Sequence, residues 1–300
     1  MELKKKPVIL DTDIGLDIDD TWALGMLLKS PELDVKLITT TNNDTTFKAK
    51  LVAKFLESVD RTDIPIGIGT KGKGPKGPLR KWVKEYDLSQ YSGIIFDNGV
   101  SAIIDTINNS PEPLNLIAIG PLGNIASVLN QNSEIINNSR FIGMQGAIRK
   151  FYEDMPDIKV EYNIAQNINA AKIVFNSEWD KTITPLDTCG VVKLSGIDFD
   201  RILESDDPIT STIVEQTKFW ARERGFYKKM IEEKTTSTLF DPVAIYLAYS
   251  EKFLNIEELK IVVTDEGRTI EDKTGTLIRC ATSWNNLKAF ENHLADRLIN

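Results

Sequence analysis

The sequence predicts an α/β protein with an open, mostly parallel, Rossmann-like sheet flanked by helices and closed by a helical C-terminal cap. Short apolar runs alternate with helical patterns over the first two thirds of the chain, which is typical of strand–helix–strand units. After about Gly190 the helical patterns dominate. The chain has 300 residues, of which 41% are hydrophobic, enough for one large core. Since no repeat or linker interrupts it, we expect a single domain over residues 1–300.

Each predicted strand is a short apolar run rich in β-branched residues and bounded by Gly, Pro, Asp or Asn. In chain order the strands are expected at 8–10, 35–40, 65–69, 114–119, 140–145 and 182–186. Their nearly continuous apolar character indicates strands buried on both faces, as in parallel sheets. A late antiparallel pair is expected at 259–264 and 275–280.

The predicted helices show apolar residues at helical spacing and begin after polar or Pro-containing turns. They are expected at 21–28, 45–59, 99–108, 121–129, 170–175, 208–234 (as one or two helices), 241–248 and 285–298. Most of them separate consecutive predicted strands. This alternation implies βαβ crossovers, which place the carboxyl ends of the strands at one edge of the sheet.

Composition narrows the class of partner. The formal net charge of -8 argues against nucleic acid or an anionic membrane surface as the main partner. No apolar run approaches the length of a membrane span, and the apolar run near the N-terminus ends at Asp11, too early for a signal peptide. A soluble, cytoplasmic protein is therefore expected. Cys189 and Cys280 are expected to be reduced core residues, and the Gly/Pro-rich basic segment 71–81 a solvated loop or an active-site lid.

The most informative segment is a row of aspartates directly after the first predicted strand. Asp11, Asp13, Asp17, Asp19 and Asp20 fall within ten residues, between an apolar strand and an apolar helix. In open α/β sheets, ligands bind at this end of the strands. Crowded carboxylates repel one another, and a hard cation with oxygen ligands offsets the repulsion. Helix capping explains one or two of these acids but not five, so the row predicts a metal or catalytic site.

Further polar clusters follow the later strands. They lie at 39–44, 120–124, 143–146, 160–167, 187–188 and 239–242. Each cluster alone is typical of a turn or a helix cap. Because the carboxyl ends of parallel strands meet at one edge, the clusters together predict the lining of one pocket.

Four of these motifs resemble those of the inosine–uridine-preferring nucleoside hydrolases. They are the acidic row, Ile117-Ala-Ile-Gly-Pro-Leu-Gly-Asn124, Glu161-Tyr-Asn163 and Phe240-Asp-Pro242, in the family's order and at about its spacing. The resemblance runs from about residue 7 to about residue 250, and more loosely to the end of the chain. It implies the nucleoside hydrolase fold, one tightly held Ca²⁺, a small-molecule ribonucleoside as substrate and a homo-oligomer, either a dimer or a tetramer.

The resemblance also implies roles for individual residues. The family's metal ligands map to Asp13, Asp20, the carbonyl oxygen of Ile119 and Asp241, a set of hard oxygens that suits Ca²⁺. Its ribose contacts map to Asp19, Asp44, Glu161 and Asn163, with Asn43 and Asn167 as further candidates. The implied reaction is hydrolysis of the N-glycosidic bond to free base and ribose. Asp13 would take a proton from a water molecule activated by the metal, and base salvage is the expected physiological role.

The chain departs from the family pattern in the first motif. Ile14 replaces a proline, and two extra residues precede the final acidic pair. We align Asp19 and Asp20 with that pair, which leaves Asp17 as an alternative ribose or metal contact.

A second departure concerns the leaving base. Phe240 stands where several members carry the histidine that protonates the base, and the chain's single histidine, His293, lies near the C-terminus. An aromatic stack can instead raise the basicity of a purine. The candidates for such a stack are Phe240, Trp82, Trp220 and Tyr227, while Tyr227 or Lys228 could donate a proton directly. The stacking route favours purine ribonucleosides.

Two other functions stay open at the level of sequence. A strand that ends in Asp-x-Asp also opens the haloacid-dehalogenase-like, Mg²⁺-dependent phosphohydrolases, in which Asp11 would be the nucleophile and Asp13 its neighbour. That pattern leaves Asp19, Asp20 and Asp241 without a role. The other alternative is a nucleoside- or ribosyl-binding protein with little turnover. The missing histidine supports this alternative, and the complete set of metal ligands argues against it.

Overall fold

The molecule is built around one large mixed sheet, seen in a computed structural model that describes residues 4–72, 74, 77–151, 155 and 157–300. The strands are β1 (Lys6–Thr12), β2 (Leu33–Thr40), β3 (Ile66–Ile68), β4 (Ile95–Phe96), β5 (Leu114–Ala118), β6 (Ser139–Met144), β7 (Lys181–Thr184), β8 (Leu254–Val263), β9 (Thr269–Glu271) and β10 (Thr276–Trp284). In this part of the chain they form a ten-stranded sheet in the order β4-β3-β2-β1-β5-β6-β7-β10-β8-β9.

The sheet is parallel from β4 to β10 and antiparallel at its far end. Parallel pairing links β1 to β2 and β5, and continues through β6 and β7 to β10. Antiparallel pairing links β8 to β10 and to β9. The carboxyl ends of β1, β5, β6 and β7 therefore lie side by side, at the centre of the sheet.

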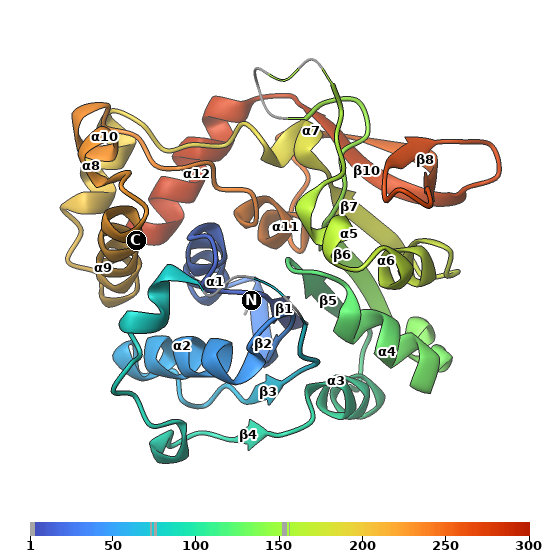
Figure 1. The fold of residues 1–300 in the computed structure, drawn as a ribbon, viewed down its shortest axis with the longest axis horizontal. Coiled ribbons are helices and arrows are strands. Elements are labelled where there is room, and N and C mark those ends of the chain that lie inside the picture. Colours follow the sequence, from blue (N-terminus) through green and yellow to red (C-terminus); the bar gives the residue numbers. More distant parts are fainter. Residues whose placement is uncertain (1–3, 73, 75–76, 152–154, 156) are drawn as a thin grey trace.

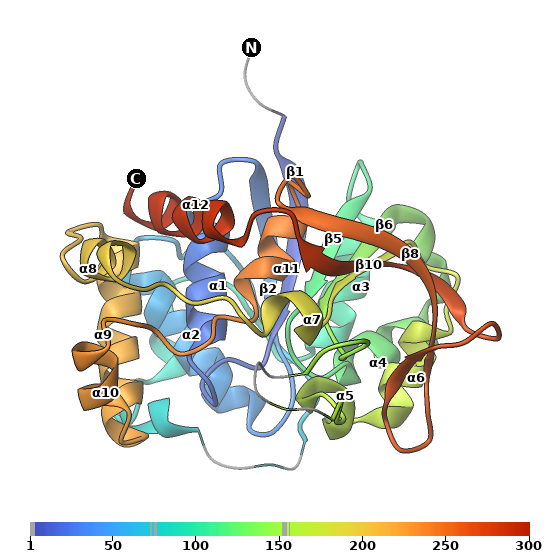
Figure 2. The same ribbon diagram turned by 90° about the horizontal axis from the view of Figure 1, so that it is seen from above.

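Helices cover both faces of the sheet (Figures 1 and 2). They are α1 (Asp19–Leu28), α2 (Thr45–Ser58), α3 (Gly99–Asn108), α4 (Gly123–Gln131), α5 (Tyr162–Gln166), α6 (Ile168–Phe175), α7 (Leu186–Cys189), α8 (Ile197–Leu203), α9 (Pro208–Glu223), α10 (Tyr227–Glu232), α11 (Pro242–Leu247) and α12 (Leu287–Ile299). Short 3-10 helices span Pro78–Lys81, Leu88–Gln90 and Ser133–Asn138.

Each face of the sheet packs against its own hydrophobic core. Successive side chains of a strand point to opposite faces, and β1 follows this rule. Val8 and Leu10 join a core with α1, α2, α9, α11 and α12. Ile9 joins a second core with α3, α4 and α6. Burial on both faces explains why the central strands are apolar throughout rather than alternating.

The predicted fold class is confirmed, including the helical C-terminal segment. Figures 1 and 2 show α8, α9, α10 and α12 together at one side of the molecule, with β8 at the other. The predicted segment 208–234 divides into α9 and α10, and Gly225 between them has a φ of +70°, a conformation that favours glycine. The late antiparallel pair is β8 and β10, and β10 also extends the main sheet by pairing with β7.

The predicted boundaries differ in places. The strand predicted at 182–186 ends at Thr184 because Pro185 lacks an N–H for the ladder, and Leu186 begins α7 instead. The helix predicted from residue 121 begins at Gly123. The sequence did not predict α5, α7, α8, β4 or β9.

Two smaller expectations can be compared directly with the structure. Within the described ranges, no helix has both the length and the apolar character needed to cross a lipid bilayer. Cys189 and Cys280 are buried free thiols, as predicted.

Candidate active site

A cavity of about 550 Å³ lies at the carboxyl ends of the central strands. Asp13 follows β1, Ile119 follows β5, Met144 ends β6 and Leu186 begins the helix after β7, and all four line the cavity. Parallel pairing of these strands brings together residues that are far apart in the sequence. The cavity is therefore at the place where α/β sheets bind ligands.

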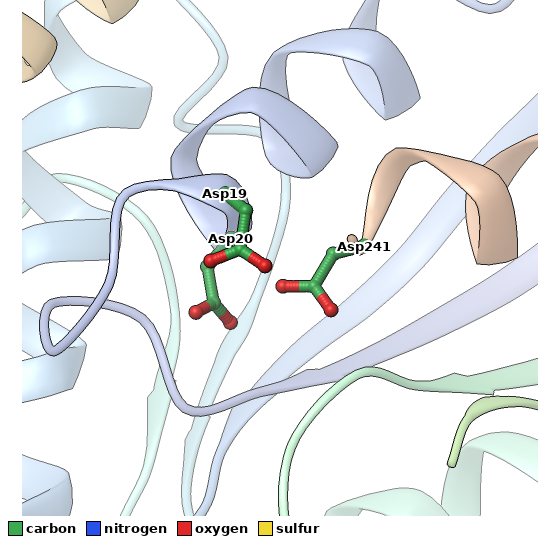
Figure 3. A group of neighbouring side chains, drawn as sticks. All are labelled: Asp19, Asp20 and Asp241. Atoms are coloured by element: carbon green, nitrogen blue, oxygen red, sulfur yellow. The ribbon is translucent and has the colours of Figure 1, made fainter. Parts of the chain in front are cut away.

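Three buried carboxylates converge at the floor of this cavity. Asp19 and Asp20 are the first two residues of α1, and Asp241 immediately precedes α11. Each is at most 5% exposed, and one carboxylate oxygen from each residue lies within 4.8 Å of the others. Figure 3 shows the two carboxylates of α1 on one side and that of Asp241 facing them. Three oxygen donors this close together could hold a metal ion.

The electrostatics of the floor favour a cation. Burial raises the pKa of Asp19, Asp20 and Asp241 well above its ordinary value, and repulsion from neighbouring carboxylates raises it further. Burial also raises the pKa of Asp13, although the nearby Lys48 ammonium opposes this. The buried Lys48 side chain donates to the backbone carbonyl of Asp13. One lysine cannot balance four carboxylates, so a divalent cation fits this site.

Cation binding at this cluster should depend on pH. A raised pKa in the folded state means that Asp19, Asp20 and Asp241 stabilise the cation-free fold at low pH, and this contribution is lost as the pH rises through the raised pKa. A bound cation compensates the negative charge of these carboxylates, as their protons do at low pH. We therefore expect the increase in unfolding free energy caused by Ca²⁺ to grow as the pH rises above the ordinary pKa of an aspartate and through the raised pKa of these groups. Denaturant unfolding with Ca²⁺ and with chelator, at several pH values, measures this increase. The same increase at every pH would contradict the prediction.

Glu161 and Asn163 form a second wall of the cavity. Glu161 caps α5 by accepting hydrogen bonds from the backbone N–H groups of Asn163 and Ile164, and it also accepts one from Gly146. Burial raises the pKa of Glu161 to about 7, although the three hydrogen bonds that it accepts act to lower this pKa. The amide of Asn163 donates to the carbonyl oxygens of Ile119 and Met144, both at 3.1 Å. These contacts hold a carboxylate and an amide beside the acidic cluster.

The rim of the cavity differs from its floor. Six floor residues are at most 6% exposed, namely Asp13, Asp19, Asp20, Glu161, Asn163 and Asp241. Phe240, Tyr162, Pro78, Glu223 and Arg224 also line the cavity and are partly or largely exposed. Burial raises the pKa of Tyr162 to about 12, so its hydroxyl stays protonated at neutral pH. The cavity thus has a buried floor of acids and amides under a more open rim with aromatic rings.

Two predicted ribose contacts lie elsewhere. Asn43 and Asp44 line a neighbouring cavity of about 380 Å³, which shares Leu16 with the first. Asp44 caps α2 by accepting from the N–H of Phe47 at 3.1 Å, and its carboxylate pairs with Arg80 at 2.8 Å. Asn167, the further candidate, caps α6. The structure therefore does not bring Asp44 together with the buried acids.

Replacing Asp44 by alanine should affect folding rather than substrate binding. Loss of the helix cap is expected to lower the unfolding free energy by about 1 kcal/mol. The KM for a ribonucleoside should stay within about twofold, because the carboxylate lies outside the main cavity. Denaturant unfolding and steady-state kinetics test the two parts separately. A rise in KM of about tenfold or more would make Asp44 a ribose contact.

Most of the aromatic residues predicted to stack on a base do not line the cavity. Trp82 donates from its indole to Glu215 and lies under the Lys54 ammonium. The indole of Trp220 donates to the carbonyl oxygen of Leu16 at 3.3 Å. Tyr227 packs under the guanidinium of Arg222. Two other predicted groups also make contacts elsewhere: Lys228 pairs with Glu232, and His293 bonds to the Tyr249 hydroxyl. Phe240 alone of the four predicted aromatic residues lines the cavity.

Some lining residues were missed by the sequence analysis. Tyr162 sits inside the Glu161-Tyr-Asn163 motif, which could have identified it. Glu223 and Arg224 lie at the end of α9, about 200 residues from the acidic row, and carry no motif. The predicted basic loop includes Lys73, Pro75 and Lys76, which lie outside the described residues, while Pro78 begins a 3-10 helix and lines the cavity.

Comparison with known proteins identifies the family of the chain. A family model described as inosine-uridine preferring nucleoside hydrolase matches residues 8–296. The chain is 28% identical over 285 residues to the pyrimidine-specific ribonucleoside hydrolase RihA of Salmonella arizonae, an alignment that covers 89% of this chain and 88% of that protein. RihA of Escherichia coli is 27% identical with the same coverage.

Solved structures show the same fold. A plant nucleoside hydrolase, PpNRh1, superposes with a TM-score of 0.81 at 21% identity and 98% coverage of both chains. A purine-preferring ribonucleoside hydrolase from Gardnerella vaginalis gives a TM-score of 0.80 at 22% identity, also with 98% coverage of both chains. The chain therefore belongs to the inosine-uridine preferring nucleoside hydrolase family, and it is an enzyme of the ribonucleoside hydrolase class.

Proposed function

We propose that this chain, acting as a single domain, uses Ca²⁺ to hydrolyse the N-glycosidic bond of ribonucleosides to free base and ribose. The observation that carries the proposal is the cluster of Asp19, Asp20 and Asp241 on the floor of a cavity at the carboxyl ends of the strands. The buried floor offers acceptors for sugar hydroxyls, and the open rim offers aromatic surface for a base. A ribonucleoside has the same division into a polar sugar and a flat base.

The residues on the floor fit a hard cation. Asp20 and Asp241 belong both to the converging cluster and to the ligand set that the family resemblance implies. Asp13 and the carbonyl oxygen of Ile119 would complete that set from the same cavity. When bound, Ca²⁺ would lower the pKa of a water molecule and bind the ribose hydroxyls. Asp19, the third member of the cluster, would accept from a ribose hydroxyl beside the ion.

The chain's own residues supply the remaining chemistry. Asp13 takes a proton from the water molecule that attacks C1′ of the ribose. Glu161 and Asn163, held by backbone contacts, orient the sugar. The electron pair of the C1′–N bond moves to the base, and the surrounding carboxylates stabilise the positive charge that develops on the ribose.

The identity of the base is open between purines and pyrimidines. The purine preference expected from the sequence depended on an aromatic stack, and of its four candidates only Phe240 lines the cavity. The Salmonella relative is named pyrimidine-specific and the Gardnerella protein purine-preferring. The proposal therefore covers ribonucleosides of both classes.

The position of Asp11 argues against the phosphohydrolase alternative, in which this residue would be the nucleophile. The Asp11 carboxylate is fully buried and accepts from Asn124 at 2.7 Å and from the hydroxyl of Thr39. Asp11 does not line the cavity. Its side chain ties β1 to β2 and α4 rather than facing a substrate.

A substrate panel tests the proposed function. The Ca²⁺-loaded protein is incubated with inosine, adenosine, guanosine, uridine and cytidine, and free ribose and free base are quantified. Equal amounts of ribose and base from at least one nucleoside would support hydrolysis. Tight binding without release would support the ribosyl-binding alternative, and phosphate release from a phosphomonoester would support the phosphohydrolase.

A further inference from the structure

Arg224 is the one basic residue among the described residues that line the main cavity. Seven acids line it as well: Asp13, Asp17, Asp19, Asp20, Glu161, Glu223 and Asp241. Arg224 follows the last residue of α9 and is exposed, so it belongs to the rim rather than the floor. A guanidinium at the rim of an otherwise acidic cavity can bind a ligand that carries oxygen acceptors.

The guanidinium is held in place by the loop that follows β1. Its Nη2 atom donates to the carbonyl oxygen of Leu16 at 2.9 Å, and the indole of Trp220 donates to the same oxygen. Asp17 follows Leu16 in the sequence, and its carboxylate is close enough to Arg224 for the two opposite charges to attract each other. A guanidinium has five N–H donors, and the Leu16 carbonyl takes one of them. Arg224 is thus both oriented and able to donate to a ligand.

Among the described residues Arg224 forms no ion pair, although the charge of Asp17 acts on it at longer range. The other charged rim residue, Glu223, is paired with Lys81 at 2.7 Å. The Lys48 ammonium is buried below and bonds to the carbonyl oxygens of Asp13 and Ile14. Since the proposed function places the ribose on the acidic floor, the base reaches the rim, where Arg224 is the available cation.

We propose that Arg224 recognises a carbonyl oxygen of the base and stabilises the negative charge that the base acquires as it leaves. This inference rests on the proposed function and narrows its substrate class to bases that carry a carbonyl group. Water oxygen bonds to C1′, the C1′–N bond breaks, and its electron pair passes to the base and spreads onto the carbonyl oxygen. Asp13 takes the proton of the water, and the departed base is protonated by solvent. A guanidinium beside the carbonyl stabilises this charge without a histidine.

Kinetics of an Arg224→Gln variant test the proposal. With inosine and uridine, kcat/KM should fall about 100-fold, because the stabilisation exists only as charge develops on the base. With 4-nitrophenyl β-D-ribofuranoside, whose leaving group is stable as an anion, kcat/KM should stay within about threefold. With inosine, the kcat/KM of Arg224→Lys should be about tenfold higher than that of Arg224→Gln, since lysine restores the positive charge but not the paired N–H donors of the guanidinium. Adenosine has no carbonyl on its base and should be among the poorest substrates.

Arg222→Gln is the matched control, because Arg222 lies two residues earlier on α9 and packs over Tyr227. It should leave all substrates unchanged. An equal loss with inosine and with the nitrophenyl riboside would show that Arg224 only positions the Leu16 loop, and unchanged inosine hydrolysis would show no role at all; either result overturns the proposal. If the wild-type protein released ribose from none of these substrates, the proposed function itself would fail, and this inference with it.

Discussion

Asp13→Asn is expected to lower kcat/KM for ribonucleoside hydrolysis by about 10³-fold while leaving the protein folded. Asp13 sits at the carboxyl end of β1, is 6% exposed and lines the cavity beside the acidic cluster. Asparagine has nearly the same shape but cannot take a proton from water. The substitution also removes one negative charge from a site where burial raises the pKa of the carboxyl, so the fold should be no less stable.

Steady-state ribose release and thermal unfolding measure the two parts of this prediction. Asp34→Asn is the matched control, because Asp34 lies near the amino end of β2 and pairs with Lys36 at the surface. It should retain full activity. An Asp13→Asn protein with a loss of only about tenfold or less would contradict the assignment of Asp13 as the general base.

Asp241→Asn is expected to abolish the stabilisation of the protein by Ca²⁺. Asp241 supplies the face of the cluster opposite Asp19 and Asp20, so its loss removes the carboxylate on that side and leaves the two acids of α1 and the neighbouring Asp13 (Figure 3). For the wild type, Ca²⁺ at about 100 times its Kd should add about 2.7 kcal/mol to the unfolding free energy. The variant should gain little, and hydrolysis should fall by at least the factor expected for Asp13→Asn.

Calorimetric titration with Ca²⁺ and denaturant unfolding with and without Ca²⁺ check this result. Asp34→Asn again serves as the control and should respond to Ca²⁺ like the wild type. If Asp241→Asn bound Ca²⁺ with unchanged affinity, the acidic cluster would not be the cation site.

The central sheet was predictable because its strands are buried on both faces. A short continuous apolar run such as that of β1 is typical of a strand buried on both faces, and the turns that follow these strands carry polar residues. The outer elements were less predictable. Edge strand β4 has two residues, and α7 has four. Segments this short have no period to detect, and their conformation is set by the packing of their neighbours.

The floor of the site was predictable for a related reason. Asp13, Asp20, Glu161 and Asn163 follow strands or begin helices, so topology alone brings them to one edge. The rim was not predictable in this way. Arg224 reaches the cavity from the end of α9, and Trp220 turns its indole to the Leu16 carbonyl rather than to the cavity. Such orientations depend on how the C-terminal helices pack on α1 and α2, which a local pattern does not encode.

The most direct test of the proposed reaction is ribose release from inosine and uridine before and after removal of Ca²⁺. Chelation should abolish release, and added Ca²⁺ should restore it, because the proposed reaction depends on the cation to lower the pKa of the attacking water. Release that continued unchanged after chelation, with metal analysis confirming that the protein was free of Ca²⁺, would contradict a calcium-dependent hydrolase.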